Sequence, residues 1–221
     1  MSLDPKFATE FVDAAAASVV LLGILIVATR AIGRTIWMVA LQAAFVGAAA
    51  VVVGVATGAW HLVFGGVVAV GLKGIAVPLI LGSILHRSSV RHERRPILGP
   101  RLALVAAVAI VFVSSAAADG VSPVAGVAAN RALPAAIAQV LTGLLVVMTR
   151  RKALSLVVGL LMFENGIALA AFSLTYGMPL VVELGVLFDV MIAVVVAWVY
   201  GRRMLDVFGS LSTDELRSLR G

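Results

Sequence analysis

The stretch ALSLVVGLLMFENGIALAAFSLTY, residues 153–176, is long and apolar enough to predict a transmembrane helix. Glu164 is its one charged residue among twenty-four. The hydrocarbon core of a bilayer is roughly 30 Å thick, so a helix needs about 20 predominantly apolar residues to cross it. The stretch therefore favours a membrane protein over a soluble one.

Six further stretches of the same kind predict an all-α membrane protein with about seven transmembrane helices. Apolar residues make up 62% of the 221 residues and charged residues 13%, whereas soluble domains are about 25% charged. The acidic leader before the first stretch argues against a cleaved signal peptide, so we expect a retained span. The expected spans are residues 12–29, 35–56, 61–85, 102–118, 132–148, 153–176 and 180–200.

The basic residues indicate an orientation in the membrane. Of the seventeen lysines and arginines, fourteen fall in alternate loops on one side of the expected spans, two fall on the other side, and Lys73 lies within a span. Cytoplasmic loops carry an excess of such residues. We therefore expect the N-terminus outside and the C-terminus in the cytoplasm. The net charge of +6 then reflects topology and not nucleic-acid binding.

Four charged residues lie at least three residues inside the ends of the expected spans: Lys73, Glu164, Glu183 and Asp189. A charge at the centre of a bilayer costs about 2.5–3.5 kcal/mol on insertion scales, and such residues commonly mark ion or proton pathways. Counted along their spans at about 1.5 Å per residue, Lys73, Glu164 and Asp189 fall near the midplane. Glu183 lies close to the outer end of its span.

Two interpretations of these charges remain open. Glu164 and Asp189 belong to spans joined by a tight turn, so they can lie at similar heights and, with Lys73, pass protons if water reaches them. Alternatively, Lys73 forms a buried ion pair with one acid and locks helices together. Pro78 removes the helical bond to the carbonyl of Gly74, and the softened helix suits either ion passage or a packing bend.

Other chemistry is not indicated. The chain has no cysteine, which excludes disulfides, iron–sulfur ligation and thiolate catalysis. The three histidines lack metal-ligand spacing, and neither a nucleotide-binding fingerprint nor a GxSxG motif is present. We expect no catalytic, cofactor-binding or metal-binding residues in this chain.

Two stretches of the C-terminal third resemble the small chain 4L (NuoK-like) subunit of respiratory complex I. They are RRKALSLVVGLLMFENGIALAAF, residues 150–172, and VVELGVLFDVMIAVVVAWVYGRRM, residues 181–204. They resemble still more closely component E of hydrogenase-4 and other group 4 membrane hydrogenases, in which further helices precede a NuoK-like three-helix unit. The resemblance implies a four-helix extension over residues 1–130, a NuoK-like unit over residues 131–204, and a cytoplasmic tail over residues 205–221.

The two acids fit this resemblance unequally. Asp189 falls where chain 4L subunits carry the acid of their last helix. The acid of the preceding helix usually comes two residues after a glycine, but here Gly159 is followed by Leu160 and Leu161, and the acid is Glu164. A shift of three residues is nearly one helical turn, about 4.5 Å. This departure favours component E over complex I.

The resemblance implies a non-catalytic membrane subunit of a complex I-like oxidoreductase in a bacterial or archaeal plasma membrane. Proton translocation would use Glu164, Asp189, Lys73 and Glu183. NiFe and iron–sulfur centres would belong to partners, namely antiporter-like and quinone-chamber-like membrane subunits and hydrophilic redox subunits. Membrane lipid is the other expected partner, and nucleic acid is not. The alternatives are a subunit of a multisubunit cation/proton antiporter and a structural membrane scaffold.

Overall fold

The computed structural model describes residues 4–87, 92, 97–118 and 132–175, and all of its described elements are helical. They are α1 (Pro5–Ala28), α2 (Ile32–Thr57), α3 (Trp60–Ala69), the π-helix η1 (Val70–Ala76), α4 (Val77–Arg87), α5 (Pro100–Ala118), α6 (Ala132–Thr149) and α7 (Ala153–Thr175). Because α3, η1 and α4 follow one another without a break, they form one continuous rod.

In the described part of the chain, six helices are long and apolar enough to cross a membrane, counting the α3–η1–α4 rod as one. They correspond to the first six expected spans, and most of their ends agree within about three residues. The chain is therefore a multi-pass membrane protein by the length and composition of its helices. The seventh expected span, residues 180–200, lies outside the described residues, as does the tail over residues 205–221.

The start of α1 differs most from its expected position. The first span was expected to begin at residue 12, but the helix begins at Pro5, within the stretch taken as a leader. The Asp4 carboxylate accepts a hydrogen bond from the backbone nitrogen of Lys6 at 2.9 Å, and Pro5 occupies the first helical turn. An aspartate cap followed by proline favours helix initiation whether or not the next residues are apolar.

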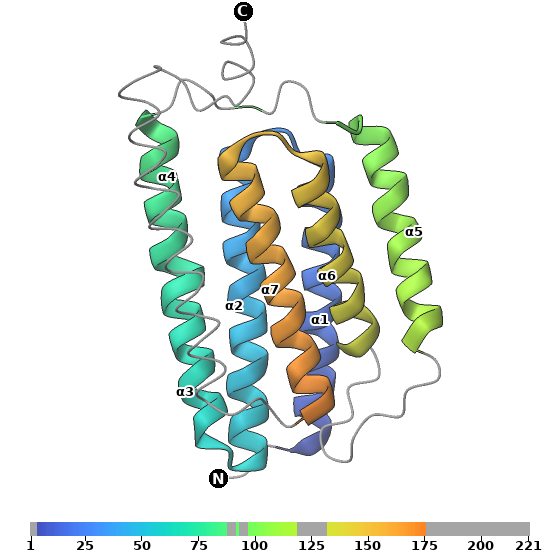
Figure 1. Ribbon diagram of the computed structural model, residues 1–221. Helices are drawn as coiled ribbons and strands as arrows, with labels where there is room; N and C mark the ends of the chain where they lie inside the picture. Colours follow the sequence, from blue (N-terminus) through green and yellow to red (C-terminus); the bar gives the residue numbers. More distant parts are fainter. Residues whose placement is uncertain (1–3, 88–91, 93–96, 119–131, 176–221) are drawn as a thin grey trace, which may run out of the picture.

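Four helices form the centre of the bundle (Figure 1). Helix α1 packs against α2 and α6, α2 packs against α7, and α6 and α7 form the most extensive helix pair. The α3–η1–α4 rod packs on α2, and α5 packs on α1 and α6 at the opposite edge. The described parts of the expected extension and the expected NuoK-like unit therefore share one core.

Glycine allows α6 and α7 to approach closely. A Cβ atom built on Gly143 of α6 would lie 2.6 Å from the backbone nitrogen of Phe163 and 2.9 Å from the carbonyl oxygen of Gly159 on α7. Small residues at such crossings are characteristic of packed membrane helices, because van der Waals contact between backbones takes the place of a hydrophobic driving force.

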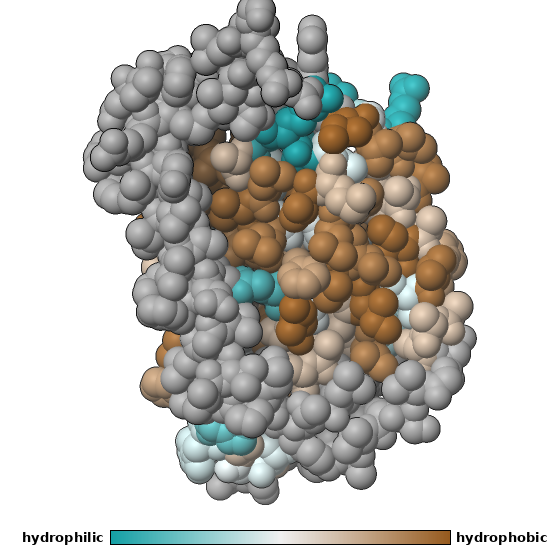
Figure 2. All heavy atoms as spheres, in the orientation of Figure 1, coloured by the Kyte–Doolittle hydropathy of each residue, from teal (hydrophilic) through white to brown (hydrophobic). Residues whose placement is uncertain are grey.

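The surface of the bundle fits a lipid environment or contact with other membrane subunits. Figure 2 shows brown, apolar residues across the middle of one face and teal, polar residues gathered at its upper end. Of the six described membrane-length helices, α5 is the least covered by the rest of the protein, since 17% of its apolar stretch is buried. Large side chains such as Val105 and Phe112 are exposed on it. Several large apolar side chains are thus available to acyl chains or to partner helices.

Candidate functional site

Lys73 lies in a distorted part of its helix. The backbone N–H of Val77 donates to the carbonyl of Leu72, five residues back, and not to the residue four back. Pro78 follows directly and has no N–H to offer Gly74. The helix before Pro78, which was expected to be softened, is the π-helix η1, a distortion that occurs frequently at functional sites.

Lys73 and Glu164 form an ion pair in the middle of the bundle. Lys73 Nζ lies 3.3 Å from Glu164 Oε2, and each side chain is 8% exposed. Glu164 is equally far from the two ends of α7, Ala153 and Thr175, and Lys73 is near the middle of the α3–η1–α4 rod. The midplane depth expected for both residues is consistent with this contact between the rod and α7.

Two of the expected site residues cannot be placed relative to this pair. Glu183 and Asp189 both lie outside the described residues. The expected proximity of Asp189 to Glu164 stays a prediction, as does the position of Glu183 near the outer end of its span.

A pair of hydrogen-bonded amide side chains, Gln42 of α2 and Gln139 of α6, also lies deep in the bundle. Gln42 is 0% and Gln139 1% exposed. Gln42 Nε2 donates to the carbonyl of Val19 on α1 at 2.7 Å. Gln139 Nε2 donates to Gln42 Oε1 at 3.1 Å and lies 3.3 Å from the carbonyl of Met162 on α7. This amide chain joins all four central helices.

Neither glutamine was predicted from the sequence, because only charged side chains within the spans were taken as candidates. The signal that could have found them was an uncharged polar side chain in the interior of an apolar span, since membrane interiors offer no water to such a group. Gln42 lies ten residues after Ile32, the start of α2, and Gln139 seven residues after Ala132, the start of α6.

Two buried amide atoms beside this region have no hydrogen-bond partner among the described residues: Gln139 Oε1 and Asn165 Nδ2. Asn165 is 2% exposed and directly follows Glu164 on α7. Gln139 Oε1 lies only 2.7 Å from the position that a Cβ atom would take on Gly23 of α1. Glycine at that position therefore leaves room for the amide oxygen.

The basic side chains of the described loops gather at one end of the bundle. The connection between α1 and α2, the end of α4, the start of α5 and the connection between α6 and α7 all lie at the upper end of Figure 1. They carry Arg30, Arg34, Arg101, Arg150, Arg151 and Lys152, and Lys6 lies in the first turn of α1 at the other end. This arrangement agrees with the expected sorting of basic residues by alternate loops.

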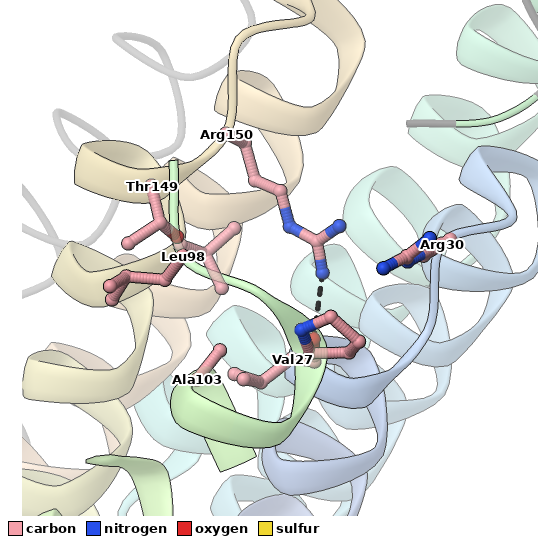
Figure 3. A pocket seen from close by; sticks show the side chains of 8 residues that line it. Val27, Arg30, Leu98, Ala103, Thr149 and Arg150 are labelled. Carbon is pink, nitrogen blue, oxygen red and sulfur yellow. Dashed lines mark hydrogen bonds between the residues drawn. The ribbon is translucent and has the colours of Figure 1, made fainter. Parts of the chain in front are cut away.

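Arg150 has a specific role at this end. Its Nη2 atom lies 3.3, 2.8 and 3.0 Å from the carbonyl oxygens of Ile26, Val27 and Thr29, at the end of α1. Figure 3 shows the guanidinium directed at Val27, with Arg30 beside it. The last carbonyls of a helix have no partner within the helix, and a cation there also favours the helix dipole. Arg150 thus joins the end of α1 to the connection after α6.

A metal site is not apparent among the residues described here, since no three histidine or acidic side chains gather there. In the described part of the bundle interior, the ion pair and the amide chain are the polar arrangements that could take part in chemistry. A lysine and a carboxylate in contact can exchange and hold protons, whereas amides only donate and accept hydrogen bonds.

Comparisons with known proteins place the chain in a family. No protein-family model matches it, and no solved structure matches it. It is 33% identical over 210 residues to the uncharacterised protein Rv0085 of Mycobacterium tuberculosis (strain ATCC 25618 / H37Rv), covering 95% of this chain and 96% of that protein. It is 27% identical over 149 residues to hydrogenase-4 component E of Escherichia coli (strain K12), covering 67% of this chain and 69% of that protein. Hydrogenase-4 component E of Shigella flexneri gives the same values. The chain therefore belongs to the family of the mycobacterial protein Rv0085 and is a distant homologue of hydrogenase-4 component E.

Proposed function

We propose that this chain is a non-catalytic membrane subunit of a complex I-like respiratory assembly of the group 4 hydrogenase type, and that it contributes to proton translocation. The contact between Lys73 and Glu164 in the middle of the bundle carries this proposal. A membrane interior makes an ionisable pair expensive, and such residues are typically retained where protons or ions pass. The distant homology to hydrogenase-4 component E supports the type of assembly.

The geometry indicates how the pair would handle a proton. With the ammonium of Lys73 against the carboxylate of Glu164, the two charges compensate each other. A proton arriving at Glu164 neutralises its carboxylate and removes the attraction that holds Lys73 in place. The π-helix η1 then gives Lys73 a segment that can shift, because its bonding pattern differs from that of the flanking helix. Asp189 and Glu183 would pass the proton to and from this pair.

The neighbouring amides suit a relay beside the pair. Gln139 Oε1 is an acceptor and Asn165 Nδ2 a donor, and both are buried without a described partner. Leaving such a group unpaired costs about 1–3 kcal/mol, so each favours a water molecule at its side. Asn165 adjoins Glu164 in the chain, which makes it the nearer candidate.

The expected orientation belongs to the same proposal. Arg30, Arg34, Arg101 and Arg150 all lie at one end of the described bundle, and the positive-inside rule makes that end cytoplasmic. The N-terminal end of α1 would then face outside, in a bacterial or archaeal plasma membrane. Hydrophilic redox subunits holding the NiFe and iron–sulfur centres would dock at the basic end, and antiporter-like and quinone-chamber-like subunits would contact the sides of the bundle.

The test replaces Glu164 by Gln, and separately Asp189 by Asn, in the assembled complex. Proton uptake by inverted membrane vesicles is measured during turnover, together with subunit assembly on native gels. We expect weaker assembly, because Lys73 loses its counter-charge, and loss of most proton uptake per assembled complex, because an amide cannot carry the proton of the carboxylate. Glu10→Gln is the matched control, since Glu10 is exposed near the start of α1. Unchanged proton uptake in both variants would refute the relay.

A structural scaffold is the second candidate, and a specific observation favours it. The amide chain of Gln42 and Gln139 already joins four helices through hydrogen bonds, and the ion pair joins the rod to α7 in a similar way. On this reading Glu164→Gln weakens assembly but leaves proton uptake per assembled complex unchanged.

A further inference from the structure

A pocket of about 330 Å³ opens at the basic end of the bundle, outside the site described above. Its lining comes from Ala31 and the first turn of α2, the last turn of α4, and His92. The backbones of Ala31 and His92 form an isolated antiparallel bridge, which places His92 beside the start of α2. The pocket is therefore made by segments that the fold brings together.

The pocket lining combines basic and apolar groups. Arg34, His86 and His92 supply nitrogen donors, all three side chains are exposed, and Ala31, Gly33 and Leu85 supply the apolar part. None of the lining residues that the structure describes is acidic. A guanidinium presents five N–H donors in a planar fork that matches phosphate oxygens, and each imidazole adds at least one donor when it is neutral or protonated. The lining is thus suited to an anion with several oxygens.

The depth of the pocket matches the headgroup level of a bilayer. Helix α2 begins at Ile32 and α4 ends at Arg87, so the pocket lies where two membrane-spanning helices leave the hydrocarbon. Gly33 keeps the apolar side open, because a Cβ atom there would lie 3.2 Å from Leu85 Cδ2. An acyl chain can therefore continue along Leu85 while its phosphate stays among the basic side chains.

We infer that this pocket binds the phosphate of an anionic membrane lipid through Arg34, His86 and His92. Basic pockets between membrane helices on the cytoplasmic side are a recognised arrangement for anionic headgroups. A zwitterionic lipid also offers a phosphate, but its own cation would face Arg34 and the histidines. The pocket therefore selects a lipid with net negative charge.

The experiment compares ligands on the purified full-length chain in a mild detergent. Phosphatidylglycerol, phosphatidylcholine and inorganic phosphate are added separately, and bound ligand is counted by native mass spectrometry and by the shift in unfolding temperature. We expect phosphatidylglycerol to bind and raise the unfolding temperature, and phosphatidylcholine and inorganic phosphate to do neither at equal concentration. Equal binding of the two lipids, or binding of inorganic phosphate with the affinity of phosphatidylglycerol, would overturn the proposal.

The variant Arg34→Gln/His86→Gln tests the location of the site. Its affinity for phosphatidylglycerol should fall about tenfold or more, the size expected for loss of charge-assisted hydrogen bonds. Arg101→Gln is the matched control, because Arg101 is an exposed arginine at the same end of the bundle but outside the pocket lining. An equal loss in both variants would mean only a general charge effect and would refute the site. If the double variant does not fold, His92→Gln must show a selective loss by itself.

Discussion

Replacing Lys73 by methionine should destabilise the chain far more than replacing an exposed lysine, because Glu164 would be left as an uncompensated buried charge. The two charged atoms lie 3.3 Å apart and each side chain is 8% exposed. At an effective dielectric constant of about 20, two unit charges at that distance attract by about 5 kcal/mol. Burial costs several kcal/mol for each ion, so the pair as a whole is close to neutral for stability.

The stability of the chain should therefore depend strongly on whether Lys73 and Glu164 are both present or both absent. Lys73→Met and Glu164→Met should each lower the free energy of unfolding by about 3–5 kcal/mol. The double variant should lie within about 1 kcal/mol of the wild type, because methionine fills a similar volume without a charge. Lys6→Met is the control and should change stability by less than about 0.5 kcal/mol, since Lys6 is exposed at the start of α1.

The assay is reversible unfolding of the purified full chain in mixed micelles, followed by circular dichroism, for the wild type, the two single variants and the double variant. The coupling energy is the difference between the double variant and the sum of the single variants. If the effects add within about 0.5 kcal/mol, as for residues that do not interact, Lys73 and Glu164 are not paired in the membrane-embedded state and the reasoning fails.

Three further changes test the packing and the ends of the bundle. Gly143→Ala should destabilise the α6–α7 pair, because its Cβ would lie 2.6 Å from a backbone nitrogen of α7. Gly82→Ala is the control, since its Cβ would meet no described atom within 4 Å. Equal unfolding temperatures for the two variants would contradict the close crossing. Arg150→Gln should increase hydrogen exchange at the end of α1, since it loses charge-assisted bonds worth about 1.5–3 kcal/mol. Arg101→Gln should not increase it, and unchanged exchange in the Arg150 variant would show that the contact is not made in solution. Gln139→Leu should cost about 1–3 kcal/mol in micelle unfolding, and a smaller loss when its amide partner on α2 is also replaced by leucine would confirm their coupling.

The sequence predicted the described spans well because helix formation in a membrane is a local requirement. Each span must satisfy its own backbone hydrogen bonds and present about 20 apolar residues to lipid. The second span was expected over residues 35–56 and is α2, Ile32–Thr57. The predicted start of the first span, residue 12, is seven residues later than the start of α1, because Asp4 and Pro5 decide where that helix begins. Hydropathy alone does not detect helix caps.

The sequence predicted where Lys73 and Glu164 lie along their helices, but not that they contact each other. Counting residues put Lys73 and Glu164 near the midplane and left open which acid Lys73 meets. The contact with Glu164 depends on how the α3–η1–α4 rod and α7 sit on α2, and this packing is not written in any periodic pattern. Gln42 and Gln139 went unnoticed for a related reason: a single amide in a span is a weak signal until both are seen to meet.

The sequence by itself determined that this chain has several helices long and apolar enough to cross a membrane, that Lys73 and Glu164 lie near the middle of two of them, and how its basic residues alternate between loops. These properties follow from transfer energies summed along each segment. Only the tertiary structure decided that Lys73 meets Glu164, that two glutamines join four helices, and that Arg150 caps α1. The physical reason is that the faces turned to lipid and to protein are both apolar in such a bundle, so hydrophobic patterning does not specify which helix faces which neighbour.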